Sequence, residues 1–543
     1  MMMKINICIT MLLISNLTHG QIEDAWVYFT DKPSAATYLG NPISMLTQRA
    51  LERRTAQSIA LSTTDVPLEA TYVAAVAASS GIQVKARSKW LNALHVRGAK
   101  IDIDALLLLN GVASVAYGNT ALNKESQYTH KIRNKETTVK EVSSLDYGLA
   151  TNQIEMLKGD FLHNLGYTGE GMHIAVLDAG FKGVESFAAF SNLHDVNTEN
   201  GEIIGGYDFV NRNANFYANT GSTHGLSVLS TIGAQLSNQF IGTAPDAQFY
   251  LFVTEDPSNE NPLEESLWVE AAERADSLGV DIINTSLGYT TFDDSSYNYS
   301  YSDMDGNTAF ISRGAELAAA TGMLLVTSAG NSGGDSWHYI SAPADAVSVL
   351  SVGAVDANES IAFFSSYGPT ADNRVKPEVL AQGQNVYVIN AAGNVATSKG
   401  TSFSSPIMAG MVACLWQAFP NRTASEIRQL IIESSDLYDN PTAQRGYGVP
   451  NFQSIYELLL IDAFEEKALK VYPNPVSTKL HFEWLPNAGF YKVVLTNPAG
   501  LEVLNTKVFK EEGGLDVSEL SSGLYFMKLG YNSFQMTVKL VKK

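Results

Sequence analysis

Ser402 is the serine best placed for chemistry in this chain, within the run Gly-Thr-Ser-Phe-Ser-Ser-Pro from Gly400 to Pro406. Apolar residues follow at helical spacing, so we predict that Ser402 lies where a loop enters a buried helix, with Pro406 in its first turn. The free N–H groups and positive end of such a helix stabilise an anion. A helix cap needs only one serine or threonine, so the whole run favours a nucleophile over a cap.

A serine hydroxyl is a weak nucleophile at neutral pH and needs a general base. His224 is the best candidate, because it has small, flexible neighbours and opens a predicted helix. Asp178 follows the buried-strand run 173–177 and could orient that imidazole. Asn331 ends the run 324–331, which predicts a strand that delivers a side-chain amide into a glycine-rich turn. A lone histidine or turn aspartate is usually structural, so it is the combination that indicates nucleophilic catalysis.

These residues lie in a segment, 146–462, in which strand-like and helix-like runs alternate. The alternation predicts an α/β domain with a doubly wound, mainly parallel sheet. In such a sheet, ligands bind at the carboxyl ends of the strands, and Asp178 is expected at one of those ends.

A second motif competes for the role of nucleophile. Residues 330–334 fit G-x-S-x-G, the nucleophile elbow of α/β-hydrolases, with Ser332 as the serine. That fold needs a helix next, whereas the residues after Ser332 are typical of a loop. It also needs a histidine well beyond the serine, and of the two that follow, His338 is too close and His481 lies in another predicted domain. We therefore favour Ser402.

The chain order Asp178, His224, Ser402, with Asn331 ahead of the serine, resembles that of the subtilisin-like serine proteases, or subtilases. The motifs that carry the resemblance occur in the family's order: Val-Leu-Asp-Ala-Gly at 176–180, Thr-His-Gly at 223–225, Ser-Leu-Gly at 286–288, Ser-Ala-Gly-Asn at 328–331, Phe-Ser-Ser-Tyr-Gly-Pro at 364–369 and Gly-Thr-Ser-Phe-Ser-Ser-Pro at 400–406. One departure is Ala179, where the family commonly has threonine. It affects only the hydrogen bonding expected around Asp178.

The resemblance implies a secreted serine endopeptidase that works through an acyl-enzyme. Ser402 would attack the peptide carbonyl, His224 would take its proton and Asp178 would hold the imidazole. The resemblance assigns the oxyanion to the side-chain amide of Asn331 and the N–H of Ser402. It assigns substrate binding to Ser286, Leu287, Gly288, Gly330 and Ser332.

Residues 286–288 follow the predicted strand 280–285 and would pair with an extended substrate as an added strand; the alternative is a simple turn. Ser332 is neutral where several members of the family carry an acid. That difference indicates uncharged residues before the cut.

Residues 1–20 place Lys4 ahead of a short apolar stretch, which is typical of a secretory signal peptide. Residues 21–120 follow the order β-α-β-β-α-β, a ferredoxin-like α+β plan. The motifs at 29–32 and 88–92 resemble the inhibitory propeptides of secreted subtilases. Residues 121–145 are polar and lack apolar periodicity, which predicts an exposed, cleavable linker.

Within the N-terminal unit, Asn41-Pro42 predicts the start of a helix that continues through Leu51. Its apolar positions share one face, which places Arg49, Arg53 and Arg54 on the outside.

Residues 463–543 carry alternating or apolar runs separated by Asn-Pro and Gly turns, which predict a small β-sandwich. Four elements resemble the C-terminal sorting domain of the type IX secretion system of Bacteroidetes: Val-Tyr-Pro-Asn-Pro at 471–475, Leu-Asp-Val-Ser at 515–518, Ser-Gly-Leu-Tyr-Phe at 522–526 and Lys-Leu-Val-Lys-Lys at 539–543. The resemblance implies export across the outer membrane, to the cell surface or the medium, with removal of the tail.

The formal net charge of −20 argues against a nucleic-acid partner. Beyond the signal peptide, no stretch approaches the ~20 apolar residues of a transmembrane helix. Cys8 lies in the signal peptide, so the exported chain would keep only Cys414 and no internal disulfide. We expect a monomer whose partners are protein or peptide substrates, its own propeptide and the type IX machinery.

The predicted chemistry requires no cofactor. The loop 292–307 holds four aspartates that could bind structural calcium, but Gly314 stands where an EF-hand has its bidentate glutamate, so we favour a solvated acidic loop. The four are Asp293, Asp294, Asp303 and Asp305. A different function for the whole chain is an inactive protease fold used as a surface adhesin or binding module. The joint presence of Asp178, His224, Asn331 and Ser402 argues against it.

Overall fold

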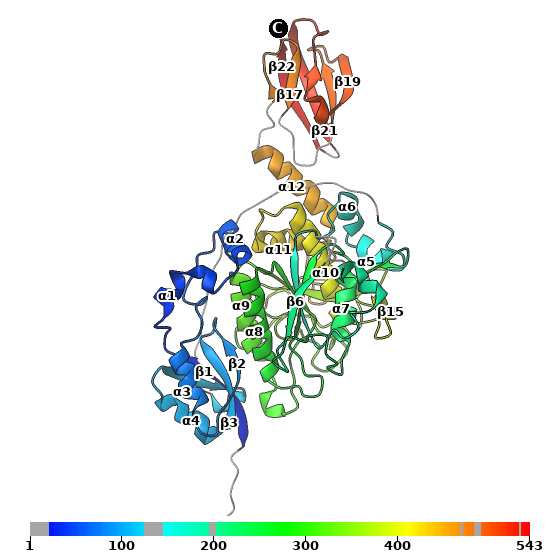
Figure 1. Ribbon diagram of the computed structural model, residues 1–543. Helices are drawn as coiled ribbons and strands as arrows, with labels where there is room; N and C mark the ends of the chain where they lie inside the picture. Colours follow the sequence, from blue (N-terminus) through cyan, green and yellow to red (C-terminus); the bar gives the residue numbers. More distant parts are fainter. Residues whose placement is uncertain (1–20, 124–144, 195–201, 467–470, 483–489, 532–533) are drawn as a thin grey trace, which may run out of the picture.

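The structure, a computed structural model, describes residues 21–123, 145–194, 202–466, 471–482, 490–531 and 534–543. At its centre lies a seven-stranded sheet whose strands all pair in parallel (Figure 1). The strand order is β13 (Val379–Gln382), β12 (Leu350–Val355), β11 (Leu324–Ser328), β10 (Ile282–Thr285), β5 (His173–Asp178), β9 (Gln248–Val253) and β6 (Glu202–Asp208). The five strands from β13 to β5 are almost wholly buried, which explains their continuous apolar sequences.

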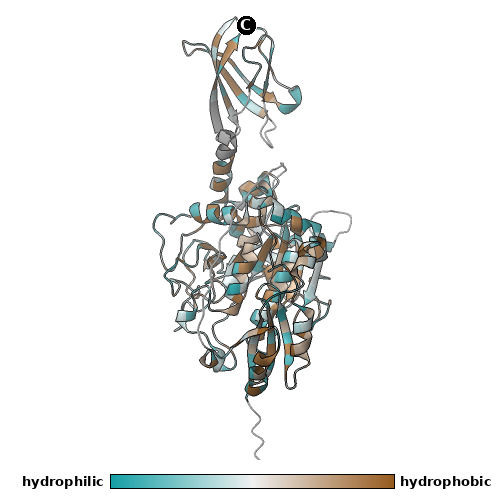
Figure 2. Ribbon diagram, turned by 90° about the vertical axis from the view of Figure 1, so that its left-hand side faces the viewer, coloured by the Kyte–Doolittle hydropathy of each residue, from teal (hydrophilic) through white to brown (hydrophobic). Residues whose placement is uncertain are grey.

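Helices cover both faces of this sheet, as a doubly wound fold requires (Figure 1). Ala175 and Leu177 of β5 face one core cluster, shared with α8 (Leu263–Leu278) and α9 (Phe310–Ala320). Ile174 and Val176 face the other, shared with α7 (His224–Gly233) and α10 (Thr401–Ala418). Hydrophobic segments run through the interior, whereas hydrophilic ones lie mainly at the outside (Figure 2). The α/β fold predicted from the sequence is confirmed.

Shorter elements complete this part of the chain. They are α5 (Thr151–Glu155), α6 (Gly159–Asn164), α11 (Ala424–Glu433), α12 (Phe452–Glu466), and the hairpins β7 (Gln235–Leu236) with β8 (Phe240–Ile241) and β14 (Val386–Ile389) with β15 (Val395–Ser398). Within the described residues, no helix combines the length and the apolar character that a membrane span needs.

Helix α10 begins earlier than the sequence suggested. Gly400, at φ 145° and ψ 151°, turns the chain directly into the helix at Thr401, so Ser402 is its second residue. Pro406 therefore lies inside the helix rather than in its first turn, and the prediction for Pro406 was wrong. Because Pro406 has no N–H, it cannot donate to the carbonyl of Ser402, four residues earlier.

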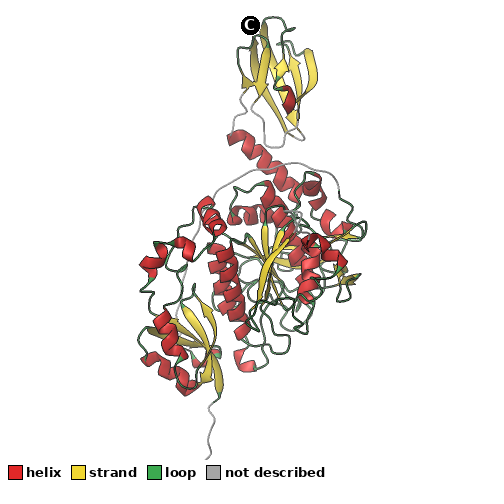
Figure 3. Ribbon diagram, in the orientation of Figure 1, coloured by secondary structure: helices red, strands yellow, loops and turns green. Residues whose placement is uncertain are grey.

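The N-terminal unit is built on a four-stranded antiparallel sheet in the order β2-β3-β1-β4, the arrangement of the predicted ferredoxin-like plan (Figure 3). The strands are β1 (Ile22–Phe29), β2 (Gln83–Ser88), β3 (Ala93–Ala99) and β4 (Val112–Tyr117). The helices are α1 (Ala35–Leu39), α2 (Gln48–Ala56), α3 (Ala70–Ala77) and α4 (Lys100–Ala105).

The helix predicted from Asn41-Pro42 is divided in two. A 3-10 turn, Pro42–Ser44, comes first, and α2 then starts at Gln48 because the Thr47 side chain accepts the N–H of Ala50 as a cap. The prediction that Arg53 and Arg54 face outward was also wrong, since both are buried. Both pair with the carboxylate of Asp276, and Arg54 also pairs with that of Asp65.

The C-terminal segment forms two small sheets. One holds β16 (Val471–Tyr472), β17 (Lys479–Phe482) and β20 (Leu515–Asp516); the other holds β19 (Glu502–Phe509), β18 (Phe490–Thr496), β21 (Gly523–Tyr531) and β22 (Phe534–Lys542). Leu480 of the first sheet and Val493 and Met527 of the second share one core. The predicted β-sandwich is confirmed.

Candidate active site

The predicted site residues lie at the carboxyl ends of neighbouring strands and at two helix starts. Asp178 ends β5, and residues 286–288 follow β10 next to it. Asn331 comes just beyond β11. His224 begins α7 and Ser402 is the second residue of α10.

Asp178 and His224 form a direct hydrogen bond, from the imidazole Nδ1 to the carboxylate Oδ1 at 2.8 Å. Asp178 is buried, whereas the His224 side chain is 38% exposed and so is open to a substrate. The negative charge of Asp178 raises the pKa of His224 above its ordinary value and outweighs the opposing effect of burial. The nitrogen left for a proton transfer is Nε2.

The surroundings of Asp178 bear on the departure at Ala179. The N–H of Ala179 donates to Oδ1 at 2.7 Å, the oxygen that also binds His224. Oδ2 is buried and has no hydrogen-bond partner among the described residues. An alanine has no hydroxyl to offer this oxygen.

The two neighbours of Ser402 in the chain contact Asn331 on one side and the His224 ring on the other. The residue before it, Thr401, donates its N–H at 2.9 Å and its hydroxyl at 3.1 Å to Oδ1 of Asn331. The ring of the residue after it, Phe403, lies 6.0 Å from the ring of His224. Because its oxygen is held, the Asn331 amide has its NH2 group free to donate elsewhere. The sequence analysis missed Thr401, although it belongs to the quoted serine motif.

A cavity of about 120 Å³ adjoins Ser402 and brings all five predicted substrate-binding residues together. It is lined by Ser286, Leu287, Gly288, Thr290, Ser328, Gly330, Asn331, Ser332, Trp337, Tyr339, Ser341, Ser366 and Ser402. Trp337 and Tyr339 come from the loop after Asn331, and no spacing or composition signal pointed to them. Ser366 had such a signal, because its motif was quoted, and its Oγ accepts the N–H of Ser332 at 2.9 Å.

The buried side-chain amide of Asn284 supports residues 286–288, and it was not predicted as part of the site. Asn284, a fully buried residue of β10, donates to Oγ of Ser286 at 3.0 Å and accepts from Oγ of Ser405 at 3.0 Å. It thus joins the strand end to α10. A polar residue inside an apolar strand run is the signal that could have found it.

The competing serine motif does not have the surroundings of a nucleophile elbow. No helix follows Ser332 before β12, a stretch that the structure describes throughout. The α/β-hydrolase interpretation of Ser332 therefore lacks its structural context.

The aspartates of the acidic loop are used in local turns. Asp294 accepts the N–H of Ser296, and Asp303 accepts the N–H of Ser300. Asp305 accepts the N–H groups of Asn307 and Thr308, and Asp293 accepts that of Glu260. Across the described ranges, no group of three or more His, Cys, Asp or Glu side chains could hold a metal ion. All four aspartates thus accept hydrogen bonds from backbone N–H groups.

Comparison with known proteins matches three successive parts of the chain to family models. The subtilase family model matches residues 169–449, a range that includes every predicted site residue. The peptidase S8 propeptide domain of Bacteroidota matches residues 24–139, and the secretion system C-terminal sorting domain matches residues 470–543.

Individual proteins that resemble this chain include subtilisins and an alkaline protease. Subtilisin DY of Bacillus licheniformis is 31% identical over 278 residues, which are 51% of this chain and 87% of that protein. Subtilisin NAT of Bacillus subtilis subsp. natto is 29% identical over 382 residues, 70% of this chain and 84% of that protein. The Thermostable alkaline protease of Halalkalibacterium halodurans is 30% identical over 282 residues, 52% of this chain and 66% of that protein.

Proposed function

The chain belongs to the subtilase family, and from this premise we propose that Asp178, His224 and Ser402 are its catalytic triad. It is a secreted peptidase zymogen with an N-terminal propeptide and a type IX sorting tail. The observation that carries the triad is the Asp178–His224 hydrogen bond, together with the position of Ser402 between contacts to His224 and Asn331.

The reaction is hydrolysis of a peptide bond in two stages. Ser402 Oγ bonds to the carbonyl carbon while His224 Nε2 takes its proton, and Asp178 keeps the other imidazole nitrogen protonated. When the C–N bond breaks, His224 gives that proton to the leaving amine and an acyl-enzyme remains. A water molecule then repeats the sequence, with His224 as its base, and frees the acid product.

The oxyanion of each tetrahedral intermediate accepts hydrogen bonds from the amide of Asn331 and the N–H of Ser402. Two features support this assignment. Thr401 holds the amide by its oxygen, so the NH2 group is the free end. Ser402 lies in the first turn of α10, where N–H groups have no partner within the helix and the dipole favours negative charge.

Residues 286–288 bind the substrate as an added strand, and the cavity beside Ser402 receives the side chain before the cut. All the residues that line the cavity are uncharged, and its volume of about 120 Å³ is below the roughly 150 Å³ of an engineered cavity that binds benzene. We therefore expect uncharged side chains of moderate size at this position. Cleavage of a peptide library tests it, with Ser332→Asp expected to introduce activity before lysine and arginine.

An active-site-directed fluorophosphonate tests the proposed nucleophile. The mature wild-type enzyme and a Ser332→Ala control should be labelled, and Ser402→Ala should not. Labelling that disappears in Ser332→Ala instead would restore the α/β-hydrolase interpretation. Labelling of none of the three would favour the adhesin.

Two further expectations belong to this proposal. The mature enzyme is a monomer, which sedimentation velocity can check. It needs no calcium at the acidic loop, because the loop's aspartates already accept hydrogen bonds from their own turns or from Glu260.

A further inference from the structure

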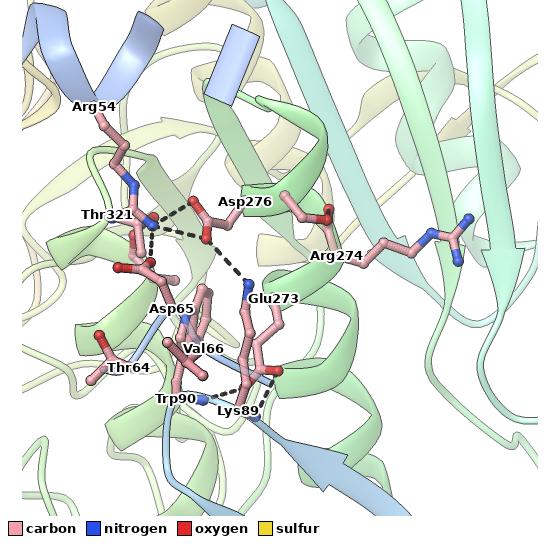
Figure 4. Close-up of polar contacts among 12 residues, drawn as sticks. Arg54, Thr64, Asp65, Val66, Lys89, Trp90, Glu273, Arg274, Asp276 and Thr321 are labelled. Carbon is pink, nitrogen blue, oxygen red and sulfur yellow. Dashed lines mark hydrogen bonds and ion pairs between the residues drawn. The ribbon is translucent and has the colours of Figure 1, made fainter. Parts of the chain in front are cut away.

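A buried group of charges joins the N-terminal domain, residues 21–123, to α8 of the catalytic domain (Figure 4). Asp276, near the end of α8, has a side chain that is 0% exposed. Its carboxylate forms ion pairs with Arg53 at 2.6 Å, Arg54 at 2.9 Å and Lys89 at 3.7 Å, all from the N-terminal domain. Burial raises the pKa of Asp276, but the charges of Arg54 and Arg53 outweigh it and hold that pKa below its ordinary value.

The group lies at the amino edge of the central sheet, opposite the triad. Asp276 precedes β10 by a few residues, and Asp281, at the entry to β10, donates its N–H to the carbonyl of His173, the first residue of β5. Asp178, at the other end of β5, marks the catalytic edge. Contacts here therefore do not depend on an occupied active site.

Helix α2 reaches several segments at this edge that are far apart in the sequence. Arg53 donates to the carbonyl of Val280 as well as to Asp276. Gln57 donates to the carbonyl of Gly322 at 2.7 Å and accepts the N–H of Ala424 at 3.2 Å.

The α2 segment is firmly tied to the rest of its own domain. Lys32, just after β1, donates to the carbonyls of Thr63 at 2.7 Å, Val66 at 2.6 Å and Lys89 at 2.6 Å. Arg54 also pairs with the buried Asp65 at 2.7 Å. Contacts that hold α2 on the catalytic domain therefore hold the whole N-terminal domain there.

This attachment adjoins the contact that the sheet of the domain makes on α8, and Lys89 takes part in both. There, Glu273 accepts from the Ser88 hydroxyl at 2.6 Å and from the N–H groups of Lys89 and Trp90, both at 2.9 Å. Trp26 stacks on Phe310 at 4.6 Å.

We propose that α2 and Asp276 form a docking surface beside that of the sheet, and that this surface sets how slowly the N-terminal domain leaves the catalytic domain once the linker has been cut. The proposal rests on the zymogen function given above. Its physical basis is the burial of the charges: an exposed ion pair contributes little, whereas removing one partner of a buried pair leaves an uncompensated charge. The cut and the release of the domain are then separate steps.

The test uses the full chain with Ser402→Ala and a recognition site for an unrelated protease placed within 124–144. After that protease has cut the linker, the rate at which the N-terminal domain leaves is measured by gel filtration over time. Arg53→Met removes only contacts across the interface and should speed release by at least about a hundredfold. Arg49→Met is the matched control: it lies on the same helix and donates to Asp281 and to the carbonyls of Gly279 and Gly171, but its side chain is 37% exposed, so release should change by no more than about fivefold.

Asp276→Asn tests the same contact from the catalytic side, and the double variant with Arg53→Met should release the domain little faster than either single one. Thermal unfolding of the uncut precursors checks that each variant folds. If Arg53→Met and Asp276→Asn both release the domain at the Arg49→Met rate, or if the parent loses it as fast as the variants, the proposal is wrong. Because Ser402 is absent throughout, these outcomes do not depend on whether it is the nucleophile.

Discussion

His224 and Ala179 share one oxygen of Asp178: the imidazole Nδ1–H and the backbone N–H both donate to Oδ1, at 2.8 and 2.7 Å. Oδ2 is buried without a partner in the described part of the chain. The hydrogen bonds to this carboxylate are thus concentrated on the oxygen that faces the imidazole. The negative charge of Asp178 favours the protonated imidazole, which forms during catalysis, whereas the N–H of Ala179 competes for the same oxygen.

The pH dependence follows from the raised pKa of His224. A general base must be neutral, so kcat/KM should fall as the pH drops through that pKa, above the usual 6.5. Asp178→Asn removes the charge responsible and should move this limb to lower pH while reducing kcat by about 10⁴-fold. Protonated His224 stabilises the folded state, an effect complete below pH 6.5 and lost as the pH rises through the folded pKa. Rate profiles of the mature enzyme check the shift, and a limb that stays in place in Asp178→Asn would assign it to another group.

Ala179→Thr offers a hydroxyl to the unpartnered oxygen of Asp178. The new hydrogen bond should spread the carboxylate charge over both oxygens, lower the pKa of His224 and shift the acid limb to lower pH, by less than Asp178→Asn does. Ala179→Val has the same shape without the hydroxyl and should leave the limb unchanged. Equal shifts in the two variants would mean that side-chain volume, not hydrogen bonding, is responsible.

Asn331→Ala should lower kcat by about 10²–10³-fold with little change in KM, because an oxyanion donor acts mainly in the transition state; this magnitude was established on a subtilisin and is carried over here. Ser332→Ala is the neighbouring control and should alter the choice of substrate more than kcat. Steady-state kinetics on one peptide separates the two effects. A loss confined to KM in Asn331→Ala would assign the amide to substrate binding instead.

The positions of Asp178, Asn331 and Ser402 could be predicted because their signals are local. Each stands at the end of a strand run or the start of a helix run, and a parallel sheet brings its carboxyl ends together whatever the loops do. The strand predicted within residues 324–331 is β11, Leu324–Ser328, in the structure. Pro406 was misplaced because a single glycine, Gly400, sets where the helix begins.

Arg53 and Arg54 could not be placed correctly from the sequence. Helical spacing puts them opposite the apolar positions, and charged residues seldom lie buried unless they are paired. Their partner Asp276 is more than 200 residues away, at separations of 223 and 222. Trp337 and Tyr339 were missed for a similar reason, because irregular loops carry no periodicity from which a position can be read.

Removal of calcium should leave the acidic loop unaffected. Each of its aspartates already accepts at least one N–H bond, and the described residues hold no group of three or more His, Cys, Asp or Glu side chains that could bind a metal ion. We expect the Tm of the mature enzyme to be the same in EGTA and in calcium. Were it to fall in EGTA, an Asp303→Asn/Asp305→Asn variant would tell whether this loop is the site, since the variant would then lose the calcium response.

Self-processing is expected to be intramolecular. The predicted linker, residues 121–145, belongs to the chain that carries Ser402, so it can be cut in cis. Cleavage of the purified wild-type precursor, followed on a denaturing gel, should therefore have a rate independent of protein concentration. The Ser402→Ala precursor should stay intact. A rate that rises in proportion to concentration would leave Ser402 as the nucleophile but make the cut intermolecular. A Ser402→Ala precursor that is cut normally when pure would rule out self-processing.

Because α2 and Asp276 hold the domain after the cut, we expect activity toward an added peptide to appear later than the cut itself. Arg53→Met should shorten that lag without changing the cutting rate.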